Sequence, residues 1–168
     1  SADGSASFTD VEVSGAAGIE ASEGVTLDAF QSLTLTATAT DGALSATDVT
    51  TGAATLSAGG TLSATDVTTG AATLSAGAGL TATRLTADDT TLSAGGDSTG
   101  GGADMTVATL RTTGVLDATS ADGSASFTDV EVSGAAGIEA SEGVTLDTFQ
   151  SLSLIATATG GALSATDV

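Results

Sequence analysis

The sequence predicts an all-β chain that winds into a right-handed parallel β-helix, a solenoid with about 18 residues per turn and about nine turns. Three observations predict this fold: a tandem repeat of 18 residues, a longer repeat of 119 residues, and apolar residues that alternate with polar ones between glycines. No stretch carries the apolar stripe of an amphipathic α-helix. We expect a right-handed winding because right-handed crossovers dominate between parallel strands.

The tandem repeat occupies the middle of the chain. Residues 42–59 read GALSATDVTTGAATLSAG, and residues 60–77 differ from them by one substitution, Ala43 to Thr61. A divergent third copy, AGLTATRLTADDTTLSAG, fills residues 78–95. A period this short encloses no core of its own. Each copy must therefore stack on its neighbours.

The longer repeat spans most of the chain. Residues 1–49 return as residues 120–168. Four positions differ between these copies: Ala29/Thr148, Thr34/Ser153, Thr36/Ile155 and Asp41/Gly160. Solenoids end in polar caps, and neither end of this chain reads as one. We therefore interpret residues 1–168 as one continuous repeat segment and expect it to be a window on a longer array.

Within one 18-residue repeat, two alternating runs predict short strands whose apolar side chains point inward. Leu44 and Ala46 belong to the first run, and residues 54–58 form the second. The polar residues between them are expected to point outward: Ser45, Thr47, Thr55 and Ser57. Glycine breaks strands, so the expected corners are Thr50-Thr51-Gly52 and Gly59-Gly60.

Stacking turns about 4.8 Å apart brings equivalent residues into columns. Three inward columns are predicted: Leu44/Leu62/Leu80, Val49/Val67/Leu85 and Leu56/Leu74/Leu92. Each buried Leu or Val contributes about 1.5–3 kcal/mol. On the outside, Arg84 follows Asp48 and Asp66 at the equivalent position of the third copy, which predicts an ion pair between Arg84 and Asp66.

Outside residues 42–95 the apolar rhythm continues at shifting intervals, which predicts turns of about 17–20 residues. The apolar residues of the first long copy are Phe8, Val11, Val13, Ile19, Val25, Leu27, Phe30, Leu33 and Leu35. Their equivalents in the second are Phe127, Val130, Val132, Ile138, Val144, Leu146, Phe149, Leu152 and Leu154. The segment Gly95–Asp104, GGDSTGGGAD, interrupts the rhythm and is expected to form a loop or widened corner.

Composition excludes several classes of function. The net charge is −19, with two Arg and no Lys or His, so a basic face for nucleic acid or an anionic membrane is excluded. No apolar run is long enough to span a membrane, so we expect no membrane insertion. The absence of Cys and His excludes disulfides, thiolate metal sites and nucleophilic triads. The acidic surface is typical either of a self-repelling extracellular fibre or of a protein from a salt-rich habitat.

Carboxylates leave two chemical alternatives open. Acid pairs suited to glycoside hydrolysis could form at Asp10/Glu12, Glu20/Glu23 and Asp88/Asp89. The first two pairs recur as Asp129/Glu131 and Glu139/Glu142, which favours a solvated acidic face over an active site, so we expect no enzyme. Calcium is the more plausible ligand, and the candidate residues are Asp88, Asp89, Asp97 and Asp104. Neither an EF-hand spacing nor a GGxGxD repeat is present, so a solvated loop without a cofactor is favoured.

Hydroxyl ranks offer a third alternative, a face that templates ice or another surface. The predicted ranks are Thr55/Ser57, Thr73/Ser75 and Thr91/Ser93, with a further row over residues 34–40. Thr is also simply a good strand residue on a wet face.

The rhythm GALSA…GAATLSAGGTLSA and the richness in Ala, Gly, Thr and Ser resemble filamentous haemagglutinin-type adhesins of bacterial two-partner secretion. The resemblance implies a right-handed β-helical stalk, extracellular or at the cell surface, that holds binding or toxin domains away from the cell. The alternative is a subunit of an assembling extracellular filament. Either reading implies contacts with neighbouring repeats, end-to-end or lateral self-association, and a receptor that the sequence does not identify.

Overall fold

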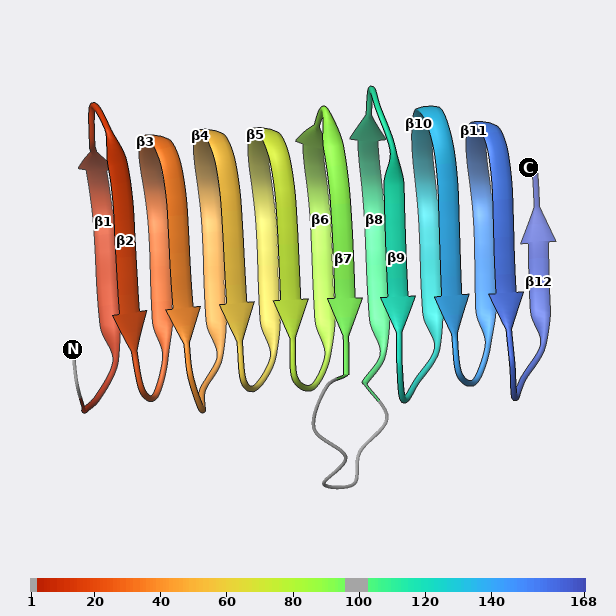
Figure 1. Cartoon of the computed structure of the whole chain (residues 1–168), viewed down its shortest axis with the longest axis horizontal. Helices are drawn as coiled ribbons and strands as arrows, with labels where there is room; N and C mark the ends of the chain where they lie inside the picture. Colours follow the sequence, from red (N-terminus) through yellow and green to blue (C-terminus); the bar gives the residue numbers. More distant parts are fainter. Residues whose placement is uncertain (1–2, 96–102) are drawn as a thin grey trace.

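A computed structural model describes residues 3–95 and 103–168 of the chain. In this part the protein is all-β, and its strands form one 12-stranded sheet wound into a solenoid of about eight turns (Figure 1). The predicted parallel β-helix is thereby confirmed. The strands are β1 (Ala6–Glu12), β2 (Ala16–Ala21), β3 (Val25–Ala39), β4 (Leu44–Ala58), β5 (Leu62–Ala76), β6 (Leu80–Ala87), β7 (Asp89–Ala94), β8 (Met105–Thr112), β9 (Leu116–Ser120), β10 (Ala125–Ala140), β11 (Val144–Ala158) and β12 (Leu163–Thr166).

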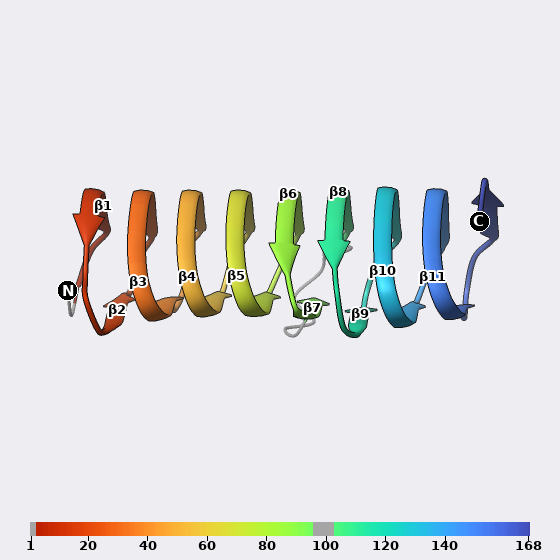
Figure 2. The same ribbon diagram turned by 90° about the horizontal axis from the view of Figure 1, so that it is seen from above.

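All strand pairs are parallel, and the turns follow one another along a straight axis (Figure 2). The average is roughly 19 residues per turn over about eight turns, close to the 18 residues and nine turns expected. A period of 18 separates Leu44, Leu62 and Leu80, but Leu80 pairs with Met105, a step of 25 residues. Extra residues enter at corners, where they do not disturb the ladder between strands. The predicted loop, Gly95–Asp104, lies within this long turn, and residues 96–102 are outside the described part.

The 119-residue repeat corresponds to whole turns of the solenoid. From Ala6, the ladder reaches Ala125 in six turns, through Val25, Leu44, Leu62, Leu80 and Met105. Ala125 is the equivalent of Ala6 in the second copy. Equivalent residues of the two copies therefore lie in the same column, on the same side of the rod.

Each turn has three straight sides, which we define on β4. Residues 44–47 form the first side, residues 49–51 the second and residues 53–58 the third, because both the ladder and the inward alternation skip residues 48 and 52. We call the breaks at Asp48, Gly52 and Gly59–Gly60 the first, second and third corners. The second and third corners match the glycine positions expected from the sequence. Thr51 is buried, and its Oγ1 donates a hydrogen bond to the Ala53 carbonyl oxygen at 3.0 Å.

The first corner was not predicted. One residue in every turn has a left-handed backbone there, with φ between 50° and 60°, and none of these residues is glycine. They are Asp10, Ala29, Asp48, Asp66, Arg84, Thr109, Asp129, Thr148 and Asp167. Asp tolerates this conformation better than most residues, so its recurrence at this position was the available signal. Ala, Arg and Thr at the same position are held there by the stacked turns on either side.

The three inward columns expected from the tandem repeat lie in the lumen, in the register that the sequence gives them. In the middle column Val49 pairs with Val67 and Val67 pairs with Leu85, and the side chains of Val67 and Leu85 are each 1% exposed. Leu85 pairs onward with Leu110, so the larger side chain that replaces Val in the third copy persists into the next turn. The two leucine columns pair in the same way and are equally buried: Leu44/Leu62/Leu80 and Leu56/Leu74/Leu92.

Side-chain sizes in the lumen compensate one another from turn to turn. On the first side of β10, Phe127 stands where β4 has Ala46, and the neighbouring Ala125 stands where β4 has Leu44. All four of these side chains are buried. Each turn thus brings a similar volume into a lumen of fixed width.

Two apolar residues that the sequence placed in the core are on the surface. Leu33 and Leu152 occupy equivalent positions of the long repeat and are 64% and 83% exposed. Both lie at the second corner, where the ladder skips a residue and the side chain turns away from the lumen. By contrast, the four differences between the long copies all fall at positions that are not buried. An apolar side chain at this corner is outward because of its position in the turn.

Candidate functional site

The lumen is filled by side chains, so any binding chemistry must lie on the outer sides and corners. The inward columns, with Val67 and Leu85 among their members, are buried and therefore hold the fold together without offering a surface to a ligand. Outside, the first side carries one outward residue per turn that is always Ser or Thr. These hydroxyl residues pair in register through nine turns: Ser7, Thr26, Ser45, Ser63, Thr81, Thr106, Ser126, Thr145 and Ser164.

Sequence reasoning missed this hydroxyl column because the phase outside residues 42–95 was not fixed. The signal was a Ser or Thr after the first inward residue of every turn.

The hydroxyl ranks that were predicted lie on the third side. Thr55 pairs with Thr73 and Thr73 with Thr91, while the corresponding serines form a second column. Thr36 extends the first of these columns by one turn. Beyond these four turns the column continues as Asp117, Gly137 and Ile155. The ranks therefore form a short patch that ends in a charged, a small and an apolar residue.

The candidate calcium ligands do not gather in one place. Asp88 and Asp89 stand at the second corner where β7 begins, and Asp104 stands at the third corner beyond the other end of β7. The strand between them is about 16 Å long at roughly 3.3 Å per residue. Asp97 lies outside the described residues.

Each of these three carboxylates already accepts a hydrogen bond from the corner that it caps. Thr113 Oγ1 donates to Asp88 Oδ1 at 3.0 Å, and the Val115 amide donates to Asp89 Oδ1 at 2.9 Å. Asp104 Oδ1 accepts from the Ser124 amide at 3.0 Å. Their arrangement fits the capping of corners, where they satisfy hydroxyl and backbone donors of the next turn. Over residues 3–95 and 103–168, no group of three or more acids is placed to hold a metal ion.

The acid pairs considered for catalysis are exposed. Asp10 lies at the first corner and Glu12 on the second side, while Glu20 and Glu23 lie at the end of the third side. Their equivalents in the second long copy lie on the same outer surface. Glycoside hydrolysis needs one acid whose pKa is raised by an enclosed site. The open surface around these residues supplies no such enclosure.

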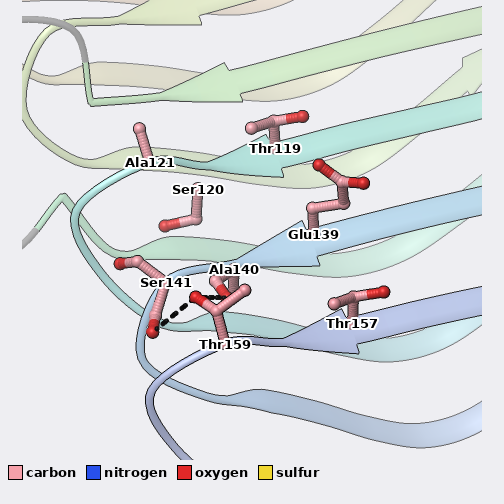
Figure 3. Close-up of a pocket in the computed structure, with 8 residues that line it drawn as sticks. All are labelled: Thr119, Ser120, Ala121, Glu139, Ala140, Ser141, Thr157 and Thr159. Carbon is pink, nitrogen blue, oxygen red and sulfur yellow. Dashed lines mark hydrogen bonds between the residues drawn. The ribbon is translucent and has the colours of Figure 1, made fainter.

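A shallow hollow of about 230 Å³ runs across the third side over β9, β10 and β11 (Figure 3). Glu139 is the one acid among its lining residues. The hydroxyls beside it are engaged with the backbone: Ser120 Oγ donates to the Ala103 carbonyl oxygen at 2.8 Å, and Thr159 Oγ1 donates to that of Ser141 at 3.2 Å. The lining contains no aromatic ring for a sugar to stack on. The hollow resembles a groove between stacked turns more than a substrate site.

Both arginines tie one turn to its neighbour. Arg84 Nε and Nη2 donate to the two carboxylate oxygens of Asp66, so the predicted ion pair is confirmed and is bidentate. Arg111 Nη1 donates to Glu131 Oε2 in the following turn. The hydrogen bond from Arg84 lowers the pKa of Asp66 from its usual 3.8. The pair also offsets the repulsion that stacked carboxylates at the first corner would otherwise have.

Comparison with models of known protein families, with curated protein sequences and with solved structures gave no match. In the part of the chain that the structure describes, no helix is long and apolar enough to cross a membrane.

Proposed function

We propose that this chain is a structural stalk segment of a large filamentous adhesin, secreted or held at the cell surface, that keeps functional domains away from the cell. The observation that carries the proposal is the match between the 119-residue repeat and six whole turns. Because of that match, added repeats extend the same ladder and the same columns without a break in phase. The resemblance of the repeat sequence to filamentous haemagglutinin-type adhesins supports the same role.

The proposed mechanism is mechanical. Backbone hydrogen bonds between successive turns run along the axis, as between the Val25 amide and the Ala43 carbonyl oxygen at 3.0 Å. Inward columns of Leu, Val and Ala resist bending because they are packed at the density of a crystal. The length of such a stalk is set by the number of turns, at about 4.8 Å each. The acidic outer surface keeps neighbouring rods apart at low salt.

Under this proposal the segment is not an enzyme and has no cofactor. Its partners are the neighbouring repeats of the array and further rods of the same kind. Receptor recognition then belongs to domains that the stalk presents. The exposed, separated acids and the engaged hydroxyls described above support a surface that is built for spacing.

Electron microscopy of the full-length protein tests the proposal, with and without calcium and at low and high salt. Single thin rods whose contour length grows with the number of repeats are expected under every condition. Rods that appear only with calcium would instead assign a ligand role to the Asp88, Asp89 and Asp104 corners. Filaments of indefinite length or thick bundles at low salt would replace the stalk by an assembling subunit.

A further inference from the structure

The second corner differs in composition from the other edges of the rod. Along the axis its residues are mostly glycine, with an exposed leucine once in each long repeat. They are Gly15, Leu33, Gly52, Gly70, Asp88, Gly114, Gly134 and Leu152. The residue that follows this corner is often Ala and is Val115 in one turn, where it is 50% exposed. The corner is therefore an apolar edge on a chain of net charge −19.

Charge sets this edge apart from the first corner. Five of the nine residues in the first-corner column are aspartates. Along the described part of the second corner and the column that follows it, the charged residues are Asp88 and Asp89, both in one turn. Both carboxylates are already hydrogen-bonded, to Thr113 and to the Val115 amide. Two acidic rods that approach side by side meet the least repulsion along this edge.

Leu33 projects from this edge because glycines flank it in the turns on either side. A Cβ on Gly52 would lie 2.6 Å from the Leu33 carbonyl oxygen, so the neighbouring turn has no room for a side chain there. The Leu33 side chain consequently has no outward neighbour of its own size along the column, and it is 64% exposed. Leu152 repeats the arrangement six turns later, about 29 Å along the axis at about 4.8 Å per turn.

We propose that the second corner is the surface along which a second copy of this rod docks side by side. A second copy is the occupant that these observations fit, since it carries leucines and glycines at the same spacing of six turns. Leu33 and Leu152 of one rod can then contact the glycine positions of the other at the same time. Because both rods are acidic, the contact forms only when salt screens the remaining charge. The inference rests on the proposed role as a rod-forming repeat and adds the surface through which rods meet.

Sedimentation velocity combined with small-angle scattering tests the docking surface. The chain is measured over a concentration series at about 0.1 M and about 1 M salt, between which the Debye length falls from about 10 Å to about 3 Å. We expect monomers at low salt, and at high salt dimers that are wider but no longer than one rod. The variant Leu33→Ser/Leu152→Ser should raise the dissociation constant at least tenfold. The matched control is Ala43→Ser/Ala162→Ser, which changes two exposed, equivalent positions at the third corner and should dimerise like the wild type.

Three results would overturn the inference: a wild type that stays monomeric at high salt, a leucine variant that dimerises as well as the control, or a dimer that is longer and no wider. Far-UV circular dichroism of each variant separates loss of docking from loss of folding. Single rods of the expected length that never pair would refute the docking surface and leave the stalk proposal standing. Chains that form no rods would refute both.

Discussion

Replacing Leu74 by alanine should destabilise the rod by about 4 kcal/mol. The side chain is fully buried, and Leu56 and Leu92 pair with it in the turns on either side. A leucine truncated in a rigid core costs about 3–5 kcal/mol, and the loss is larger where the surroundings cannot collapse into the hole. Hydrogen-bonded turns on both sides fix the height of this hole, so we expect the upper part of the range.

A second substitution in the same turn should restore much of this loss. In β3 and β9 the large and small residues are exchanged, with Leu116 ahead of Ala118 where β5 has Ala72 ahead of Leu74. The double variant Leu74→Ala/Ala72→Leu copies the arrangement of β9 and keeps the volume within the turn. We expect it to recover at least half of the stability lost by Leu74→Ala, since contacting positions couple by about 0.5–3 kcal/mol.

Urea unfolding followed by far-UV circular dichroism measures both variants, because the chain has no Trp or Tyr for fluorescence. Midpoints at an unchanged slope give the differences in the free energy of unfolding. A loss below about 1 kcal/mol for Leu74→Ala would mean that the column is not enclosed. A double variant that is less stable than Leu74→Ala would refute the idea that each turn carries a constant volume.

Three further substitutions probe the corners. Thr109→Gly should stabilise the protein by about 1 kcal/mol, because Thr109 has φ 60° and a β-branched residue is strained there, while Asp129→Gly at the next turn should gain less in the same urea titration. Arg84→Gln should lower stability at pH 7; the pKa of Asp66 is lowered in the folded state, so this deficit should persist above pH 3.8 and vanish as the pH falls through the lowered value, and a deficit unchanged at pH 2 would contradict the ion-pair account. Gly70→Ala should destabilise by more than about 1 kcal/mol, because its Cβ would lie 2.5 Å from a carbonyl oxygen of the preceding turn, and a neutral effect on the unfolding midpoint would show that this corner relaxes.

The strands and the inward columns were predictable because alternation with period two reports directly which side chains share a face. The pairing of Leu56, Leu74 and Leu92 follows from the 18-residue repeat alone, as does that of Val67 with Leu85. The number of turns did not follow, since 119 is not a multiple of 18 and alternation does not count corner residues. The ladder settles it, because a long turn from Leu80 to Met105 restores the phase.

The corners were the part that sequence reasoning handled least well. Glycine marks two of them, but the first corner is built on non-glycine residues with positive φ, and a run such as Thr47-Asp48-Val49 reads as strand throughout. For the same reason Leu33 looked like a core residue, because a hydrophobic pattern does not show where the chain turns. The candidate ligand residues were near one another in sequence, and only the stacking of turns showed that Asp88 and Asp104 stand at different corners.

The most direct test of the account adds one more repeat. Because residues 120–168 repeat residues 1–49, a second copy of residues 50–168 placed after Val168 continues the array in phase. Small-angle scattering of both chains at low salt gives their longest dimension and their cross-section. The account predicts an increase of about 29 Å in length, six turns at about 4.8 Å, with no change in cross-section. A longer chain that is wider, bent back on itself or extended by a clearly different length would contradict the six-turn repeat and the stalk built on it.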